Sequence, residues 1–229
     1  DMAGLFITAT GTEIGKTLVT AALCHQAREA GTPLQTLKPI ISGLDADTMA
    51  DSDTAVIAQA LGLPINDTTF DQISPFRFKA PLAPTMAAKA EGRTLDYDAV
   101  IQTCRGALES DNFTLIEGVG GSFVPLADGR LVADWITDLG LESILVAGSY
   151  LGTISHTIST LEAMQARGLK VRAIVVSESA RGTLYANPDL AETANEIERL
   201  TGLPVATIPR IQAAHPWRHV PPLLHLLDA

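Results

Sequence analysis

The chain has 229 residues, 46% of them hydrophobic, and a formal net charge of −10. The length suits a single α/β domain over residues 2–229, with Asp1 interpreted as a cloning remnant ahead of Met2. The acidic balance argues against a nucleic-acid partner, because a phosphate backbone requires concentrated positive charge. The sequence has no apolar run of about 18–20 residues and no recognisable secretory leader, so we expect no membrane partner and a cytoplasmic location.

The first predicted elements are a strand over residues 4–7 and a helix over residues 17–30. Between them lies Thr8-Ala9-Thr10-Gly11-Thr12-Glu13-Ile14-Gly15-Lys16-Thr17. A strand, a glycine-containing turn and a helix that opens with Gly-Lys-Thr form the geometry of a P-loop, whose backbone N–H groups surround a triphosphate. Lys16 would reach the outer phosphates, and the Thr17 hydroxyl would bind a magnesium ion. We therefore expect an ATP-using enzyme, although Thr10 stands where the general motif has glycine.

The next predicted elements are a strand over residues 34–41 and helices over 53–61, 85–90 and 97–108. Short apolar strands follow at residues 113–116, 143–147, 171–176 and 205–208, with helices at 153–167 and 192–200 between them. Residues 221–227, together with Trp217, suggest an amphipathic closing helix. The alternation predicts an α/β fold, P-loop NTPase-like, with a mostly parallel sheet and helices on both faces. In such a sheet, ligands bind where the strands end.

Polar residues at the strand ends are therefore the candidates for chemistry. Lys38 lies in the end of the second predicted strand, with Ser42 four residues later, and could place a second cation near the transferred phosphate. Glu117 ends the third strand before Gly118-Val119-Gly120-Gly121, and either caps this turn or holds magnesium. A second carboxylate could come from the acidic loop, where sequence position leaves four alternatives open: Asp45, Asp47, Asp51 and Asp53.

Two later segments are weaker candidates for enclosing the nucleotide base. Ser177-Glu178 ends the strand near residue 176, and Pro209-Arg210-Ile211 follows the last strand. The cysteines and most histidines lack metal-ligand spacing, so we interpret Cys24 and Cys104 as small buried residues and the histidines as surface or packing residues.

Taken together, these motifs resemble the dethiobiotin synthetase family. The resemblance covers residues 10–17, the segments Lys38-Pro39-Ile40-Ile41-Ser42-Gly43, Ser52-Asp53 and Glu117-Gly118-Val119-Gly120-Gly121, residues 144–156 and Ile208-Pro209. It implies ATP- and magnesium-dependent closure of a cyclic urea from 7,8-diaminopelargonic acid and CO2. An amine captures CO2 as a carbamate, the carbamate attacks the γ-phosphate, and the second amine displaces phosphate from the resulting anhydride.

The resemblance also implies roles for individual residues. Lys16, Lys38 and Thr12 would be catalytic, and Thr12, Lys38 and Ser42 would face the diamine or its carbamate. Magnesium would be held by Thr17, Asp53 and Glu117, which selects Asp53 among the loop carboxylates. The family works as a homodimer, and residues 151–156 are the candidate contact between subunits. The nucleotide would be bound by Glu13, Ile14, Gly15, Lys16, Thr17, Leu18, Asp53, Glu117, Gly118, Val119, Gly120, Ser177, Glu178, Pro209, Arg210 and Ile211.

The chain departs from the family pattern at two places. The family loop usually begins with glycine where Ala9 stands and has aspartate where Gly11 stands; an alanine fits there if its φ is negative. An Asn-Asp pair that reads adenine is replaced by Ser177-Glu178, and a serine offers one hydroxyl where asparagine offers a donor and an acceptor. We therefore expect weaker recognition of adenine.

Two other functions share this loop and sheet. An amide-forming synthetase of the cobyrinic acid type usually carries an additional glutamine-hydrolysing domain, for which this chain has no room. A partition or septum-placement ATPase carries a second lysine near the start of its loop, and residues 9–13 contain none. Both alternatives are therefore less favoured than the synthetase.

Overall fold

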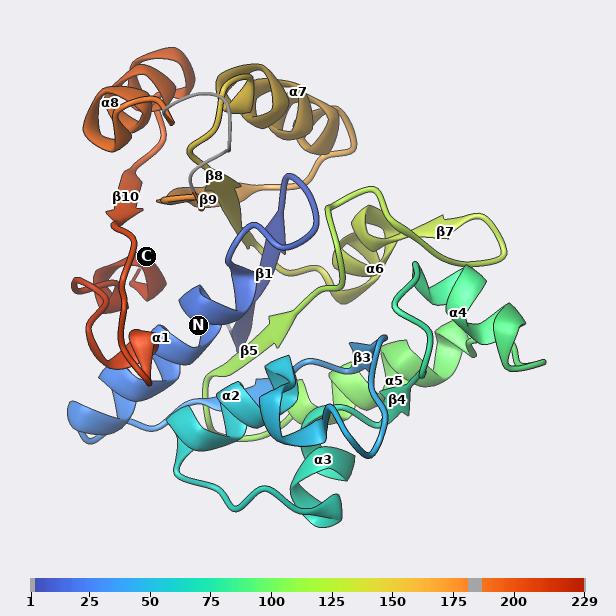
Figure 1. Cartoon of the computed structure of the whole chain (residues 1–229). Helices are drawn as coiled ribbons and strands as arrows, with labels where there is room; N and C mark the ends of the chain where they lie inside the picture. Colours follow the sequence, from blue (N-terminus) through green and yellow to red (C-terminus); the bar gives the residue numbers. More distant parts are fainter. Residues whose placement is uncertain (1–2, 181–186, 229) are drawn as a thin grey trace.

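The sheet that organises the molecule has six strands in the order β10-β9-β8-β1-β5-β2 (Figure 1). The computed structural model describes residues 3–180 and 187–228, so Asp1 and Met2 lie outside the described residues. Every neighbouring pair of strands in this sheet is parallel. The strands are β1 (Gly4–Ala9), β2 (Gln35–Leu37), β5 (Thr114–Glu117), β8 (Ser143–Gly148), β9 (Val171–Ser177) and β10 (Val205–Ile208).

Strand β1 is central and lies between β5 and β8, with Ile7 opposite both Glu117 and Ile144. All six residues of β1 are buried. Helices must therefore cover the sheet on both faces, which explains why this strand reads as a continuous apolar run instead of an alternating one. The register also places the loop after β1 beside the end of β5, where Glu117 stands.

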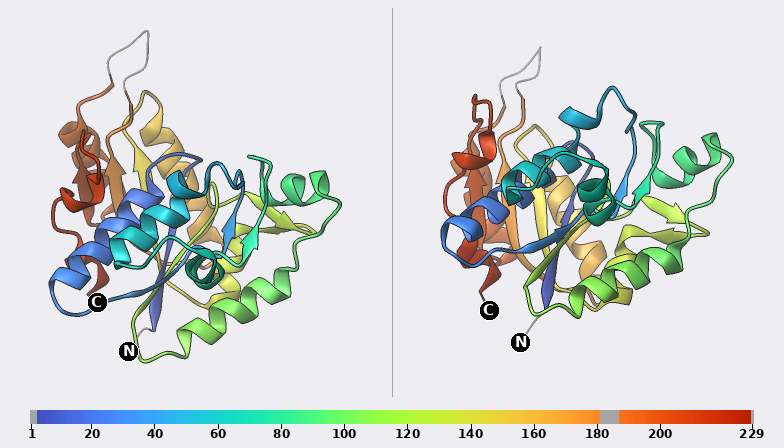
Figure 2. Two further views of the ribbon diagram at one scale, coloured as in Figure 1. Left: turned by 60° about the horizontal axis from the view of Figure 1, so that its bottom comes forward. Right: turned by 90° about the horizontal axis from the view of Figure 1, so that it is seen from below.

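Helices cover the two faces of the sheet in two groups (Figure 2). One buried cluster joins Phe6, Ile116 and Val176 to helices α5 to α8, and the other joins Ile7, Leu115 and Val146 to α1, α2 and the C-terminal segment. This arrangement confirms the predicted α/β class. The helices are α1 (Lys16–Glu29), α2 (Asp53–Leu61), α3 (Asp67–Ile73), α4 (Pro84–Ala90), α5 (Tyr97–Leu108), α6 (Val132–Leu139), α7 (Thr153–Ala166) and α8 (Leu190–Thr201).

The predicted strand over residues 34–41 is wrong as a single element. Only β2 belongs to the main sheet, whereas β3 (Ile40–Ile41) pairs with β4 (Phe76–Arg77) in a separate two-stranded sheet. Pro39 stands between β2 and β3 and has no N–H to donate to a ladder, so the chain leaves the main sheet there. Lys38 therefore lies at the break between the two sheets.

The predicted closing helix over residues 221–227 is also wrong. The C-terminal segment instead forms two short 3-10 turns, η2 (Pro216–Arg218) and η3 (Leu224–Leu227). Pro221 and Pro222 lie between them, and two successive prolines remove the donors that a longer helix requires. The segment still packs on the core, since Trp217, Val220, Leu223 and Leu226 are buried.

Several short elements were not predicted. These are α3, α6, the turn η1 (Met49–Asp51) and the hairpin of β6 (Pro125–Ala127) and β7 (Arg130–Leu131). The hairpin reverses at Asp128-Gly129, where both residues have positive φ. The prediction for the cysteines is confirmed, since Cys24 and Cys104 are both free and buried. Within the described ranges, no helix is long and apolar enough to cross a membrane.

Candidate functional site

The loop between β1 and α1 has the backbone geometry that binds phosphate. Gly15 precedes α1 with φ of 116°, and a Cβ there would lie 2.9 Å from the hydroxyl of Ser177, so glycine is required both by conformation and by space. Ala9 ends β1 and is not among the described residues with positive φ, as expected for an alanine at the start of the loop. The N–H groups at the start of α1 consequently face the space beyond the loop.

Lys16 lies at the first position of α1 and is 7% exposed. Its ammonium donates to the carbonyl of Gly120 at 2.8 Å, which ties the loop to the turn after β5. Burial and, secondarily, the nearby ammonium of Lys38 lower the pKa of Lys16 from 10.5 to about 8, against the attraction of Glu117 and Asp53. An anion bound here would therefore supply charge compensation that the free protein lacks.

Glu117 is fully buried and is the centre of a hydrogen-bonded group at the end of β5. One of its oxygens accepts from the Thr17 hydroxyl at 2.9 Å and from the Lys38 ammonium at 2.5 Å. The other oxygen accepts from the Thr20 hydroxyl at 2.6 Å. A buried carboxylate is costly unless it is paired in this way, so these contacts allow a charge to remain at the floor of the site.

Lys38 is 4% exposed and faces two carboxylates. Its ammonium lies 2.5 Å from Glu117 and 3.5 Å from the side chain of Asp53. Burial acts to lower the pKa of Lys38, but the charges and hydrogen bonds of Glu117 and Asp53 outweigh it and hold the pKa above its usual value. The two carboxylates therefore favour the protonated form of Lys38.

The structure separates the four acidic residues of the loop after β3. Asp45 accepts hydrogen bonds from the backbone N–H groups of Asp47 and Thr48, so its carboxylate closes its own exposed turn. Asp51 ends the turn η1, whereas Asp53 opens α2 and pairs with Lys38. Only Asp53 among these four lines the large cavity described next.

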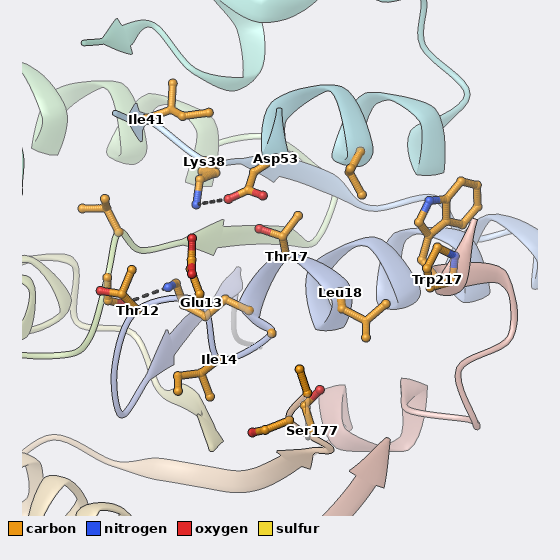
Figure 3. Close-up of a pocket in the computed structure, with 18 of the residues that line it drawn as sticks. Thr12, Glu13, Ile14, Thr17, Leu18, Lys38, Ile41, Asp53, Ser177 and Trp217 are labelled. Carbon is orange, nitrogen blue, oxygen red and sulfur yellow. Dashed lines mark hydrogen bonds and ion pairs between the residues drawn. The ribbon is translucent and has the colours of Figure 1, made fainter. Parts of the chain in front are cut away.

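A cavity of about 840 Å³ lies along the carboxyl edge of the sheet (Figure 3). It brings together the P-loop, the two lysines and the segments that follow β5, β9 and β10. Two of the predicted site residues, Glu117 and Gly118, do not line this cavity. Gly118 packs against the ring of Phe6, and its carbonyl faces the Lys38 ammonium at 3.5 Å. The predicted residues that line the cavity are Thr12, Glu13, Ile14, Gly15, Lys16, Thr17, Leu18, Lys38, Ser42, Asp53, Val119, Gly120, Ser177, Glu178, Pro209, Arg210 and Ile211. Glu117 lies beneath them.

The residues after β9 and β10 are held together at one end of the cavity. The backbone N–H of Arg210 donates to the Glu178 carboxylate at 2.7 Å, and the N–H of Glu178 donates to the carbonyl of Ile208. Ser177 is nearly buried against Gly15. One carboxylate oxygen of Glu178 is therefore occupied by the protein backbone.

Sequence reasoning missed several residues of this site. Thr20 could have been found, because it lies four residues after Lys16 and therefore on the same face of α1. Trp217, Val56 and Gln59 line the cavity but carry no local motif. The stretch from Pro81 to Pro84 also lines it, and only the tertiary structure brings that stretch near the P-loop.

The oxygen atoms of this site fit a magnesium ion. Thr17, Asp53 and Glu117 offer one hydroxyl and two carboxylates around the same pair of lysines. Magnesium takes oxygen ligands and usually needs only one or two carboxylates besides phosphate and water. Among the described residues, no three or more histidine, cysteine or acidic side chains are grouped so that they could hold a metal ion.

The chain is similar to known proteins over most of its length. Residues 3–216 match a protein family described as an AAA domain. The chain is 46% identical over 194 residues to the ATP-dependent dethiobiotin synthetase BioD of Caulobacter vibrioides, covering 84% of this chain and 85% of that protein. It is 41% identical to the protein of the same name from Phenylobacterium zucineum, covering 91% and 89%. The corresponding protein of Haloferax mediterranei is 37% identical, with 92% and 85% covered.

Solved structures are similar in fold at low sequence identity. A ParA family ATPase from Chlorobium tepidum TLS has a TM-score of 0.50 and 16% identity, covering 90% of this chain and 84% of that one. The MinC:MinD cell division protein complex of Aquifex aeolicus gives a TM-score of 0.53 and 12% identity, covering 91% and 81%. These similarities establish a P-loop NTPase-like fold and nothing more specific.

Proposed function

Because the chain belongs to the ATP-dependent dethiobiotin synthetase family and is an ATP-dependent ligase of biotin biosynthesis, we propose that the cavity at the carboxyl edge of the sheet is where the reaction takes place. The enzyme carboxylates 7,8-diaminopelargonic acid with CO2 and closes the ureido ring. Three bonds form in turn, while the P–O bond to ADP and the C–O bond to phosphate break and each amine loses a proton. An amine nitrogen bonds to CO2 and loses a proton, a carbamate oxygen takes the γ-phosphoryl group from ATP, and the second amine then displaces phosphate.

The observation that carries the proposal is that two buried lysines lie together at the phosphate end of the cavity, next to Glu117. Lys16 comes from α1 and Lys38 from the end of β2, yet both lie beside Glu117. Phosphoryl transfer to a carbamate joins two anions, so charge neutralisation and alignment are the main requirements. Lys38 would hold the carbamate and Lys16 the outer phosphates, while Thr12 and Ser42 at the rim would orient the diamine.

Magnesium would be held by Thr17, Asp53 and Glu117. When bound, it supplies further positive charge next to the phosphate oxygens. Asp53 is half exposed, with 55% of its side chain accessible, and can therefore turn from Lys38 towards a cation. Glu117 keeps its orientation through the hydroxyls of Thr17 and Thr20.

Two candidate functions from the P-loop superfamily are not favoured. The fold similarity to ParA and MinD proteins stands at 12–16% identity and supports the fold alone. The loop residues from Ala9 to Glu13 contain no lysine that could act across a dimer. The synthetase relatives, in contrast, are similar over most of the chain.

The test is incubation of the protein with 7,8-diaminopelargonic acid, bicarbonate, ATP and magnesium while phosphate release is followed. We expect release only when the diamine is present, together with one dethiobiotin for each phosphate. Release that ignores the diamine would instead indicate a switch ATPase. Omission of magnesium should reduce turnover to background, and activity that persists in a chelator would remove the metal from the proposal.

The proposal includes a homodimer in the cytoplasm, where ATP is available. Leu151 is 84% exposed at the turn before α7, at the same edge of the sheet as the cavity. A leucine this exposed suits a surface that a second copy covers, and residues 151–156 would then approach the partner's substrate. Leu151→Asp should shift the protein to a monomer in light scattering and raise KM for the diamine, whereas Leu200→Asp, at an exposed leucine of α8, serves as the control.

Weaker selection of adenine also belongs to the proposal. Ser177 lies against Gly15, and Glu178 is bound to the backbone of Arg210. Neither side chain offers the paired donor and acceptor of an asparagine amide. ATP, GTP and CTP should therefore support comparable turnover, and a strict ATP requirement would contradict this part of the proposal.

A further inference from the structure

The C-terminal segment runs back across the molecule and ends beside α1 (Figure 2). Its turn η2 packs on this helix: the ring of Trp217 lies 5.2 Å from that of His25, in an edge-to-face arrangement. Val220, Leu223 and Leu226 are buried in the same cluster as Val19, Ala22 and Leu23. The segment is therefore part of the core on the face of the sheet that carries the P-loop helix.

The side chain of Gln26, on α1, bonds to the backbone of this segment at three residues. The amide nitrogen of Gln26 donates to the carbonyls of Val220 at 3.2 Å and Pro221 at 3.0 Å. Its amide oxygen accepts from the N–H of Leu223 at 2.7 Å. The two prolines leave these carbonyls outside any helix, so Gln26 supplies partners that regular structure does not. Three hydrogen bonds from one residue fix the distance between α1 and the segment.

The segment also forms a wall of the cavity. Trp217 is only 3% exposed, yet it lines the cavity together with Ile211, Ala214 and Pro216. Leu18, two residues after the lysine of the P-loop, lies between Trp217 and Ser177 in Figure 3. Trp217 lies at the opposite end of the cavity from Lys38 and Thr12 (Figure 3). The side chains of Ile211, Ala214 and Pro216, which line the same cavity, are apolar. A flat, uncharged ring attached to a triphosphate fits such a wall.

We propose that Trp217 is a base-contacting residue of the nucleotide site and that Gln26 is the positioning residue that holds it there. The inference rests on the proposed function, because it takes the triphosphate to be bound by the P-loop. Contact with an aromatic wall depends on the area of the base and not on its hydrogen-bonding edge. The wall therefore supplies affinity for the base where Ser177 and Glu178 supply little recognition of it.

The test compares ATP with inorganic tripolyphosphate, which has the phosphates but no base. Trp217→Ala should raise the Kd of ATP about tenfold, within the range measured for aromatic contacts to bases. Gln26→Ala should raise it about fivefold, because the wall loses three hydrogen bonds that fix it. The Kd of tripolyphosphate and the KM of the diamine should stay within about twofold in both variants. Trp217→Phe should recover most of the affinity for ATP.

A matched control is Gln102→Ala, at an exposed glutamine of α5 that makes no side-chain hydrogen bond within the part of the chain the structure describes. Gln102→Ala should leave the Kd of ATP, the Kd of tripolyphosphate and the KM of the diamine unchanged. Gln26→Glu keeps the acceptor for Leu223 but loses both donors, so it should fall between the wild type and Gln26→Ala. Binding of ATP should also change the tryptophan fluorescence of the wild type, and this change should be absent in Trp217→Phe, since Trp135 is fully buried in the other core.

The outcomes separate this inference from the proposed function. If tripolyphosphate and ATP weaken equally in Gln26→Ala, the residue has a general structural role and the inference is overturned. If ATP binding is unchanged in Trp217→Ala but lost in Lys16→Ala, the inference fails while the P-loop site stands. If Lys16→Ala binds both ligands as well as the wild type, the nucleotide site itself is elsewhere and both fail.

Discussion

The two ends of the cavity are built in opposite ways. At the phosphate end, Lys38 and Glu117 are buried charges joined by a short hydrogen bond, and the buried Lys16 donates to the carbonyl of Gly120. At the other end, Trp217 and Ile211 form an apolar wall carried by a segment with no helix longer than one turn. The first end comes from the termini of sheet strands, and the second from a segment that the core and Gln26 fix in place.

This difference shows how a site divides its tasks. Charges that must neutralise a transferring phosphoryl group have to be rigid, because a preorganised dipole or cation costs no reorganisation during the reaction. Strand ends of a parallel sheet provide that rigidity. A base far from the reacting atoms contributes binding only, so it can rest on a less regular surface. Changes at the phosphate end should therefore reduce kcat, and changes at the apolar end should reduce affinity.

The largest effect is expected at Lys38. Lys38→Met should lower kcat at least about a thousandfold, as for removal of a preorganised group at the reacting centre. It should also lower the free energy of unfolding by about 3 kcal/mol, because it leaves the buried charge of Glu117 unpaired. Phosphate release and thermal melting measure the two effects. The double variant Lys38→Met/Glu117→Gln should regain stability without regaining activity; recovered activity would show that Lys38 acts only through the fold.

The next largest effect is a pH dependence of ATP binding that arises from Lys16. Burial lowers the pKa of Lys16 to about 8, whereas bound phosphates require its protonated form. Above pH 8 the free protein must therefore take up a proton on binding, and the Kd of ATP should rise by up to about tenfold per pH unit. Below pH 8 this group should contribute no dependence. Calorimetry at pH 8.5 in buffers of different ionisation enthalpy measures the proton uptake, which Lys16→Met should abolish.

The stability of the nucleotide-free protein should change in the matching direction. A lowered pKa means that folded Lys16 binds fewer protons than the unfolded chain between about pH 8 and 10.5. Its contribution to the free energy of unfolding should therefore rise with pH in this window. Lys38, whose pKa is raised, contributes stability below its folded pKa and loses it as the pH rises through that value.

A smaller effect is expected at Thr20, which supports Glu117 from below. Thr20→Val removes the 2.6 Å hydrogen bond and should lower the free energy of unfolding by about 1–3 kcal/mol, because one carboxylate oxygen is left without its donor. Activity should fall only a few-fold, since Thr20 does not line the cavity. Thr157→Val is the matched control: within residues 3–180 and 187–228, the hydroxyl of this buried threonine bonds only to the carbonyl of Thr153. Equal losses in denaturant unfolding would mean that the bond to Glu117 adds nothing.

The smallest effect concerns the choice of base. ATP, GTP and CTP should give kcat/KM values within about fivefold of one another, since no more than about 1 kcal/mol separates them without a matched hydrogen-bond pair. Ser177→Asn should restore a preference for ATP of about tenfold, the contribution of one net hydrogen bond. Competition among the three nucleotides in one reaction measures the ratio. A strong preference for ATP in the wild type would mean that residues other than Ser177 and Glu178 recognise the adenine base.

Much of the fold and the phosphate end of the site could be predicted from the amino-acid sequence. Apolar runs located five of the six strands of the main sheet to within two residues, and the bounds of α2, α5 and β10 agree with prediction. The exception is β2, because the predicted strand over residues 34–41 joined it to β3. The Gly-Lys-Thr loop, Lys38 and Glu117 could be placed because strand ends of a parallel sheet meet at one edge. That residues 2–229 form one domain stays a prediction, as do the roles of the individual site residues.

The tertiary structure alone decided which residues from distant segments meet. It separated Asp53 from Asp45 and Asp51, since only packing of α2 brings a carboxylate to Lys38. It also placed Thr20 under Glu117 and brought Trp217 and Leu18 to the lining of one cavity, although no local period relates these residues. Hydrophobic periodicity reports which face of an element is buried, but not against what. The partner of a buried side chain is set by the packing of the whole chain. In the C-terminal segment, two prolines prevent the predicted closing helix, and Gln26 instead bonds the backbone groups that a helix would have paired.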